Sequence, residues 1–372
     1  MVAHVFSQFA ISSMLTSFPG AESTTDKFEI SSTESCGRAP LGFGGHSAVL
    51  VGEKVFIFGG HYMSSTGSFV CSNQLFILDL VRMKWSLPIF EGVAPRGRYN
   101  HTSAAVGDEV FIFGGRGDGK VLRDMHVLEI SRSLKWKRAQ RGNAPAARHG
   151  HSCDVFAGNL YFFGGHGLDS FFGDLYTFET RTGTWKSLDS AGPAPSPRAF
   201  HASTISGSLL IIHGGMQAIP KIEDLKKSGE IIASSFLDDL RVLDIERWTW
   251  SRLHTRGPLP SPRYSHTISQ VGESLVILGG WQGQRRCIVC NALLPQHTED
   301  CEVRNSEVVG KPGDELVHSL SLGTLEWSPI PTGDEAMRFG HSSVLVSDEE
   351  LLIFGGWNGA KSIGSLCTLR KN

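Results

Sequence analysis

Six times along this chain of 372 residues, a short apolar run leads directly into a pair of glycines. These copies span residues 55–60, 110–115, 160–165, 210–215, 275–280 and 351–356. A stretch that recurs six times is a structural unit, so this repeat constrains the fold more than any other feature. Residues common to every copy are expected to serve the architecture. Residues that differ between copies are the better candidates for function.

Other residues recur at fixed distances from each glycine pair. A histidine lies thirteen or fourteen positions before the first glycine of every pair. An arginine lies three residues before that histidine in five copies, and Phe43 takes this position in the first. A tryptophan follows in most copies, after an alternating apolar segment such as 174–178. Each unit therefore contains four short runs rich in Val, Ile, Leu and Phe, punctuated by Gly and Pro. Such runs are typical of strands.

A four-stranded unit of about 50 residues is the size of a propeller blade. The Arg-x-x-His element, the apolar-Gly-Gly run and the distal Trp together resemble kelch repeats over residues 26–372. This resemblance implies an all-β fold: a six-bladed kelch β-propeller with four antiparallel strands in each blade. It also implies a single domain. Residues 1–25 are moderately apolar but contain no Lys or Arg, so we expect a disordered or weakly ordered leader or a start-site artefact in preference to the alternative of a secretory signal.

The two ends of the chain predict how the ring closes. The sixth unit has a third strand at 365–369 and then ends without a fourth strand or a Trp. Residues 27–30 lie at the spacing of a fourth strand, with Ile30 in the position of the missing Trp. We therefore expect the N-terminal strand to complete the last blade, which removes two exposed sheet edges.

Composition narrows the classes of partner and compartment. The formal net charge is −2, and Lys and Arg form no run, so nothing favours nucleic-acid binding. No apolar run reaches the roughly 20 residues of a membrane span. The odd count of seven cysteines fits poorly with full disulfide pairing. We expect a monomer of the cytoplasm, the nucleus or both.

Blade geometry predicts where the variable residues meet. The b–c loops (between second and third strands) and the d–a loops (between one blade and the next) share one face of an antiparallel propeller. The five arginines near the channel suggest a funnel for a carboxylate-rich peptide or a phosphate. In the alternative, which their presence in nearly every copy favours, each Arg and His bonds backbone of the neighbouring blade. The candidate partner-binding residues are Arg98, Arg148, Arg198, Arg263 and Arg338 around the channel, with His61, Tyr99, Arg116, His166, Phe200, Tyr264, Trp281, Phe339 and Trp357 on the rim.

Two b–c loops are much longer than the others, at residues 216–238 and 281–314. Long loops in compact domains tend to be functional or disordered. The second contains three cysteines and a histidine within fifteen residues, a set able to ligate one zinc ion. The candidate structural zinc ligands are Cys287, Cys290, His297 and Cys301. An apolar loop without metal is the alternative, and no other cofactor is expected.

We interpret the chain as a non-catalytic adaptor that binds a protein or peptide on the face of the b–c and d–a loops. Trp, Tyr and Arg, which combine apolar area with a polar handle, are enriched at such sites. The kelch resemblance leaves two alternatives open. One is a substrate receptor of a ubiquitin ligase, and the other is a kelch-type enzyme: a metal-dependent oxidase, a sugar epimerase or a specifier-like protein. Since function on a propeller resides in its faces, the fold alone does not decide between them.

Overall fold

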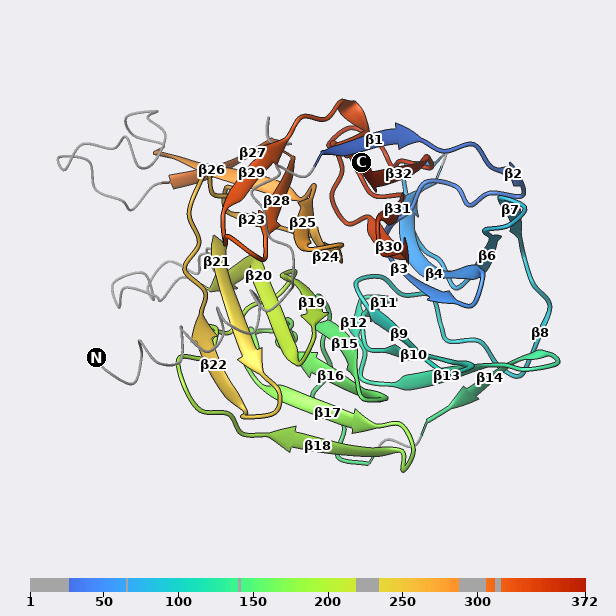
Figure 1. Cartoon of the computed structure of the whole chain (residues 1–372). Coiled ribbons are helices and arrows are strands. Elements are labelled where there is room, and N and C mark those ends of the chain that lie inside the picture. The colour runs from blue at the N-terminus through green and yellow to red at the C-terminus, as the bar shows by residue number, and fades with distance from the viewer. Residues whose placement is uncertain (1–26, 65, 140–141, 219–233, 288–305, 312–315) are drawn as a thin grey trace.

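The computed structural model describes residues 27–64, 66–139, 142–218, 234–287, 306–311 and 316–372. Six antiparallel sheets surround a central axis as the blades of a propeller, which confirms the predicted all-β fold (Figure 1). Within the described residues the helical structure is a 3₁₀ turn at Asp334–Ala336, and no helix there is long and apolar enough to cross a membrane.

The four strands of each blade run outward from the axis in the order a, b, c, d, as follows. Blade 1 contains β3 (Gly44–Val51), β4 (Lys54–Met63), β6 (Leu75–Asp79) and β7 (Lys84–Ser86), and blade 2 contains β9 (Thr102–Val106), β10 (Glu109–Phe113), β13 (Met125–Ile130) and β14 (Leu134–Arg138). Blade 3 contains β15 (Ser152–Phe156), β16 (Asn159–Phe163), β17 (Leu175–Glu179) and β18 (Thr184–Leu188), and blade 4 contains β19 (Ala202–Ser206), β20 (Leu209–Ala218), β21 (Ser234–Asp244) and β22 (Thr249–Arg252). Blade 5 contains β24 (Thr267–Val271), β25 (Ser274–Leu278), β28 (Val317–Ser321) and β29 (Trp327–Ile330), and blade 6 contains β30 (Ser342–Ser347), β31 (Glu350–Phe354), β32 (Leu366–Lys371) and β1 (Phe28–Ser32).

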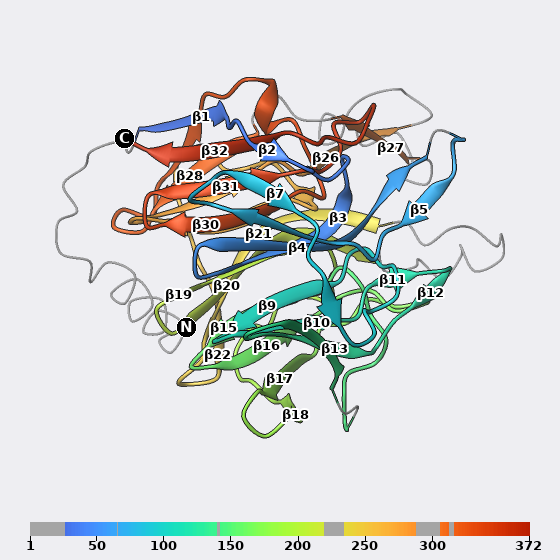
Figure 2. The ribbon, with the colours of Figure 1, turned by 90° about the vertical axis from the view of Figure 1, so that its right-hand side faces the viewer.

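Strand β1 closes the ring as predicted. It pairs antiparallel with β32, so that the first and last strands of the chain lie side by side (Figure 2). Ile30 faces Leu369, the same register in which Trp185 faces Phe178 in blade 3. Ile30 also packs against the apolar cluster between blades 5 and 6. The N-terminal strand therefore supplies the apolar contact that the sixth repeat lacks.

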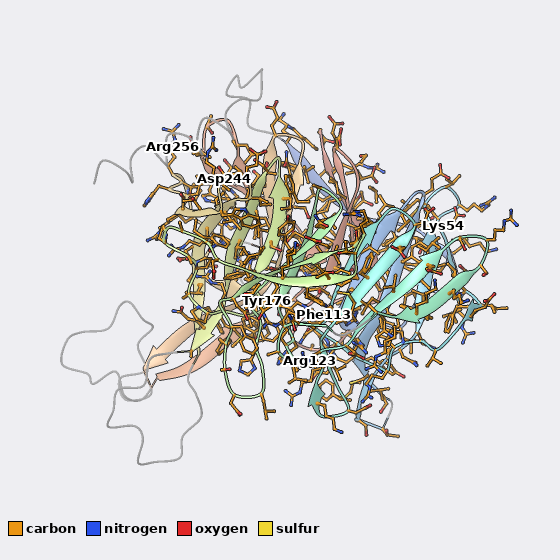
Figure 3. All side chains as sticks on the ribbon, turned by 90° about the horizontal axis from the view of Figure 1, so that it is seen from below. Lys54, Phe113, Arg123, Tyr176, Asp244 and Arg256 are labelled. Carbon is orange, nitrogen blue, oxygen red and sulfur yellow. The ribbon has the colours of Figure 1, made fainter. Side chains whose placement is uncertain are left out.

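The core lies between the blades, where side chains of neighbouring sheets fill the space (Figure 3). The recurring tryptophan packs against the last residue before the Gly-Gly pair of the preceding blade. In blade 3 the Trp185 ring lies 4.9 Å from the ring of Phe113, and in blade 4 Trp250 lies 5.5 Å from Phe163. Aromatic pairs at these separations stabilise beyond the area that they bury. The Trp thus serves blade-to-blade packing.

Short straps on the outer edge also join successive blades. Two of them, β2 (Cys36–Gly37) and β8 (Phe90–Glu91), run parallel to the fourth strands β7 and β14 of the next blade. A similar bridge joins Ala191 to Thr249. At Gly192, beside this bridge, φ is +79° and an added Cβ would lie 2.2 Å from the carbonyl oxygen of Trp250. Glycine is required at that position both for its conformation and for the close approach.

Four b–c connections extend the blades with hairpins. In the predicted insertion 216–238, β20 and β21 continue past the blade with a register shift between His213 and Gly215. In the insertion 281–314, β26 (Trp281–Cys287) pairs with β27 (Ser306–Lys311), and β26 also pairs with β23 (Arg263–Tyr264). Shorter hairpins are formed by β5 (Phe69–Cys71) with β4, and by β11 (Arg116–Gly117) with β12 (Lys120–Val121). The leader and residues 219–233, 288–305 and 312–315 lie outside the described part of the chain.

Candidate protein-binding face

The variable positions converge on one face, as the repeat predicts. In each blade the residue two positions before the repeat histidine pairs with the residue that follows the Gly-Gly pair. The pairs are Gly44 with His61, Tyr99 with Arg116, His149 with His166, Ala199 with Met216, Tyr264 with Trp281, and Phe339 with Trp357. We call the surface formed by these pairs and the adjoining b–c hairpins the loop face.

A closed circle of backbone hydrogen bonds surrounds the axis just inside the loop face. The residue preceding each repeat histidine has a positive φ, between 52° and 66°. Its N–H donates to the carbonyl of the equivalent residue in the preceding blade, at 2.7–2.8 Å. The six members of this axial ring are Gly45, Asn100, Gly150, Phe200, Ser265 and Gly340. The ring fixes the six first strands relative to one another and gives the face a rigid centre.

The repeat histidines form a belt of inter-blade contacts behind the axial ring. In four blades the hydroxyl that follows one histidine is hydrogen-bonded to Nε2 of the next, for example Ser47 Oγ to His101 at 2.8 Å. Ser152 and His201 do not make this bond. In blade 4 Ala202 offers no hydroxyl, and His213 Nδ1 contacts Nε2 of His266 at 3.0 Å instead. Burial lowers the pKa of His46 to about 4. We define the histidine belt as His46, His101, His151, His201, His266 and His341.

The belt histidines share this burial, and the pKa of His201 is lowered to about 3 for the same reason. They are therefore neutral near pH 7. The structural interpretation of these histidines accounts for their contacts, which join neighbouring blades.

The five repeat arginines do not form an anion-binding funnel, which corrects one expectation. All five are buried. Each donates to the carbonyl oxygen of the first glycine of its own blade's pair, as Arg98 does to Gly114 at 2.9 Å. Arg98 also donates two bonds to Asp124, at 2.9 and 3.0 Å. Arg98, Arg148, Arg198, Arg263 and Arg338 therefore leave the candidate binding surface, because a buried guanidinium committed to its own blade presents no donor to a partner.

Carboxylates within or immediately before the third strands complete three of these arginine sites. Burial alone would raise the pKa of Asp124, but hydrogen bonds from His126 and Arg98 hold it well below its usual range. Burial would also raise the pKa of Asp239, but hydrogen bonds from Arg198 and Arg241 outweigh it and lower this pKa to about 2. Arg148 pairs in the same way with Asp174. These are ion pairs within blades 2, 3 and 4.

The remaining predicted residues lie on the loop face in aromatic clusters. At blades 6, 1 and 2, the ring of His61 lies 4.7 Å from Tyr99 and 6.0 Å from Trp357. At blades 5 and 6, Trp281 meets Phe339 edge-on at 4.9 Å. These five side chains are each half-buried, so they combine a fixed position with an accessible surface. That combination is characteristic of anchor residues in protein interfaces.

A basic edge adjoins the first cluster. Arg116 is exposed, and its side chain has no hydrogen bond or ion pair with another described residue. It lies close enough to Tyr99, His149 and His166 to influence the pKa of each. Burial, with smaller effects of His166 and Arg116, lowers the pKa of His149 to about 4. At neutral pH His149 and His166 are therefore uncharged, and the positive charge beside them comes from Arg116.

Sequence reasoning missed several residues of the face. Phe69 on β5 is 65% exposed and contacts the rings of His61 and Trp357. Phe171 packs on His166, and Phe236 packs on Tyr264. An apolar side chain in a b–c loop was the available signal for all three.

The candidate zinc ligands are not placed by the structure. Cys290, His297 and Cys301 fall outside the described residues, as does the side chain of Cys287. Among the residues that are described, no group of three His, Cys, Asp or Glu side chains is arranged to hold a metal ion. The zinc site stays a prediction.

Comparison with known proteins agrees with this architecture. The plant acyl-CoA-binding domain-containing protein 4 of Arabidopsis thaliana is 29% identical over 74% of this chain. Human host cell factor 2 is 27% identical over 87% of it, and rat host cell factor 1 is 28% identical over 85%. The aligned part covers only 37%, 40% and 15% of these three relatives. The model of the KLHDC2/KLHL20/DRC7 kelch-repeats domain matches residues 45–280, and the chain therefore belongs to this kelch-repeat family.

Proposed function

We propose that this propeller is a non-catalytic adaptor that binds a protein or peptide on its loop face. The observation that carries the proposal is the set of half-buried aromatic side chains around the axis, joined by the exposed Phe69 and Arg116. Large amphipathic side chains held by a rigid scaffold bind with little loss of conformational entropy. A partner on this face would span several blades at once.

The chemistry of the histidines supports a binding function over catalysis. General acid–base groups work best with a pKa near the working pH. The belt histidines have pKa values well below that range and contact neighbouring blades. Their number in the sequence therefore reflects the architecture. A ubiquitin ligase is one assembly in which such an adaptor would serve, as its substrate receptor.

Selection from a displayed library of random peptides tests the proposal with the full chain as bait. Peptides enriched on the wild type should bind Phe69→Ala/Arg116→Glu at least about tenfold more weakly, since an aromatic contact is lost and a charge is reversed. The matched control is Ile89→Ala, which removes a 95% exposed side chain next to β8 on the outer edge. Equal losses in both variants, or no enrichment at all, would count against the loop face.

A further inference from the structure

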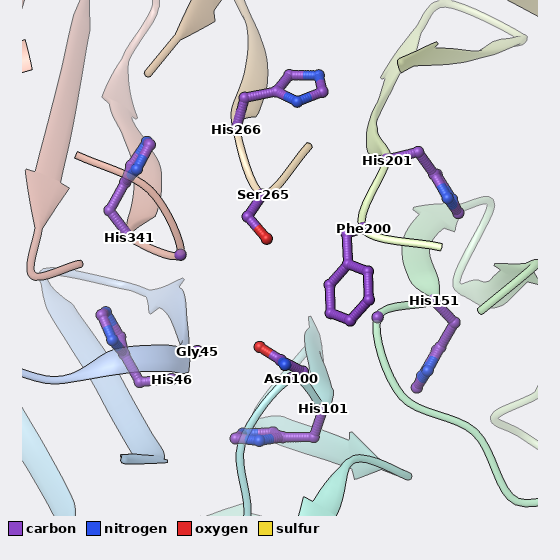
Figure 4. Close-up of a pocket in the computed structure, with 12 residues that line it drawn as sticks. Gly45, His46, Asn100, His101, His151, Phe200, His201, Ser265, His266 and His341 are labelled. Atoms are coloured by element: carbon purple, nitrogen blue, oxygen red, sulfur yellow. The ribbon is translucent and has the colours of Figure 1, made fainter. Parts of the chain in front are cut away.

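A small cavity opens at the axis within the loop face. It has a volume of about 170 Å³ and is lined by the axial ring and the histidine belt (Figure 4). Three members of the axial ring are glycines, so the side chains that reach the centre are those of Asn100, Phe200 and Ser265. A cavity of about 150 Å³ accommodates one benzene ring. The axial cavity therefore has the capacity for a single side chain of a partner.

Backbone conformation at Phe200 points to a role beyond packing. Phe200 has φ +57°, a left-handed conformation that is a genuine outlier for a bulky residue. Three other blades use glycine at the same position without this strain. The left-handed backbone belongs to the axial ring in all six blades, so the feature particular to blade 4 is that a bulky side chain occupies this position beside the cavity.

Neighbouring residues hold the Phe200 ring in place. Its ring lies 5.4 Å from His149 and 6.0 Å from Tyr264, both on the loop face. It also passes over Gly150, where an added Cβ would come within 2.8 Å of the ring. The ring therefore has a defined orientation and closes one side of the cavity.

The polar groups at the axis are neutral and available. Neither the amide of Asn100 nor the hydroxyl of Ser265 is hydrogen-bonded to another described residue, and both side chains are half-buried. Amide and hydroxyl groups both donate and accept hydrogen bonds. Around them, the belt histidines are neutral at pH 7 and the repeat arginines point into their own blades. A charged ligand group would lose water here without gaining a counter-ion.

We propose that the axial cavity receives one uncharged side chain of the protein partner, with an apolar body against Phe200 and an amide or hydroxyl group bonded to Asn100 and Ser265. This inference rests on the proposed binding function and specifies its central contact. Glutamine, asparagine and tyrosine have that chemistry. Asp, Glu, Lys and Arg do not.

Three monosubstituted benzenes of similar size test this preference on the full chain: benzamide, benzoate and benzylammonium. Binding is measured by saturation-transfer NMR titration at pH 7.5. Benzamide should bind at least about tenfold more tightly than either ion, a ratio comparable to one hydrogen bond. Tighter binding of benzoate or benzylammonium would overturn the inference, and so would the absence of saturable benzamide binding.

Glycine variants locate the bound probe without new strain, because glycine readily adopts the left-handed conformation. Phe200→Gly and Asn100→Gly should each weaken benzamide binding about tenfold, whereas Ile89→Ala on the outer edge should leave it unchanged. Thermal unfolding checks that each variant is folded, and Ser265→Gly replaces any that is not. Unchanged benzamide affinity in the folded glycine variants would refute the assignment.

The two proposals fail separately. If selected peptides depend on Phe69 and Arg116 but tolerate Phe200→Gly, the loop face binds its partner and the axial cavity does not. If the peptides do bind at the axis, replacing their anchor Gln, Asn or Tyr by Glu should weaken binding at least about tenfold. Retained affinity after that replacement would refute the neutral anchor alone.

Discussion

The buried ion pair between Arg98 and Asp124 provides a test of the structural role of the repeat arginines, because blade 1 lacks both partners. There Phe43 occupies the arginine position, and Gln74 precedes the third strand as Asp124 does in blade 2. We expect the double variant Arg98→Phe/Asp124→Gln, which copies blade 1, to be more stable than either single variant.

The expected magnitude follows from burial. Arg98 is fully buried, and the side chain of Asp124 is 14% exposed. Removing Asp124 costs about 3–5 kcal/mol, since the buried guanidinium loses its charged partner, and removing Arg98 costs less because Asp124 keeps its bond to His126. Domains have total stabilities of about 5–15 kcal/mol, so each single variant should lose a large fraction. The double variant leaves no unpaired charge, and we expect a coupling energy of about 2–3 kcal/mol.

Urea unfolding followed by tryptophan fluorescence measures the stability of all four members of this cycle. The matched control is the pair of Arg370 and Glu350, whose side chains are 63% and 29% exposed. That pair should couple by less than about 1 kcal/mol and weaken further in salt. Additive losses at Arg98 and Asp124, or single losses below about 1 kcal/mol, would refute the argument.

Three further outcomes are expected. Unfolding by urea should become easier as the pH falls from 6.5 towards 4. Unfolded histidines take up protons near pH 6.5, whereas burial holds the belt at pKa values such as about 4 and about 3, so the unfolded state binds protons first. Asp154, whose pKa burial raises to about 7, opposes this trend, and Asp154→Asn should therefore steepen it. Ile30→Asp should lower the melting temperature by several degrees, because a carboxylate would enter the cluster between blades 5 and 6, whereas Ser31→Asp on the same strand should not. Gly192→Ala should cost at least about 1 kcal/mol more than Gly183→Ala in urea unfolding, since both have positive φ but only the former meets backbone within 4 Å; equal costs would contradict the strap geometry.

The architecture was predictable from the sequence because the repeat carries it in six copies. Even the register of Ile30 followed from counting positions back from the first repeat. The carboxylate partners of the arginines were not predictable from the sequence. Each lies on the far side of the b–c loop, and the number of residues between arginine and carboxylate varies. Asp124 comes 26 residues after Arg98, whereas Asp239 comes 41 residues after Arg198. Pairing across a loop of variable length leaves no fixed spacing to detect.

The candidate site was predictable in outline only. Counting from Gly-Gly located Trp281 and Trp357 on the loop face, because register determines which residues share an edge. The axial cavity was not predictable, because it depends on a left-handed backbone at Phe200 that no propensity indicates. A hydroxyl follows five of the six belt histidines, so that pattern was visible in the sequence and simply overlooked.

Some departures from the repeat are offset by a second change in the interior and others are not, and this difference separates architectural from functional residues. Blade 1 lost its arginine and also has glutamine in place of the aspartate. Blade 4 lost the hydroxyl at Ala202, and His213 took over its contact. Both changes preserve the interior and need no partner. Phe200, Phe69 and Arg116 have no such internal counterpart: one is strained and two are exposed. The ring contacts of Phe200 and Phe69 do not require a bulky left-handed residue or an exposed phenyl ring, so an external ligand is the cause that best explains these three residues.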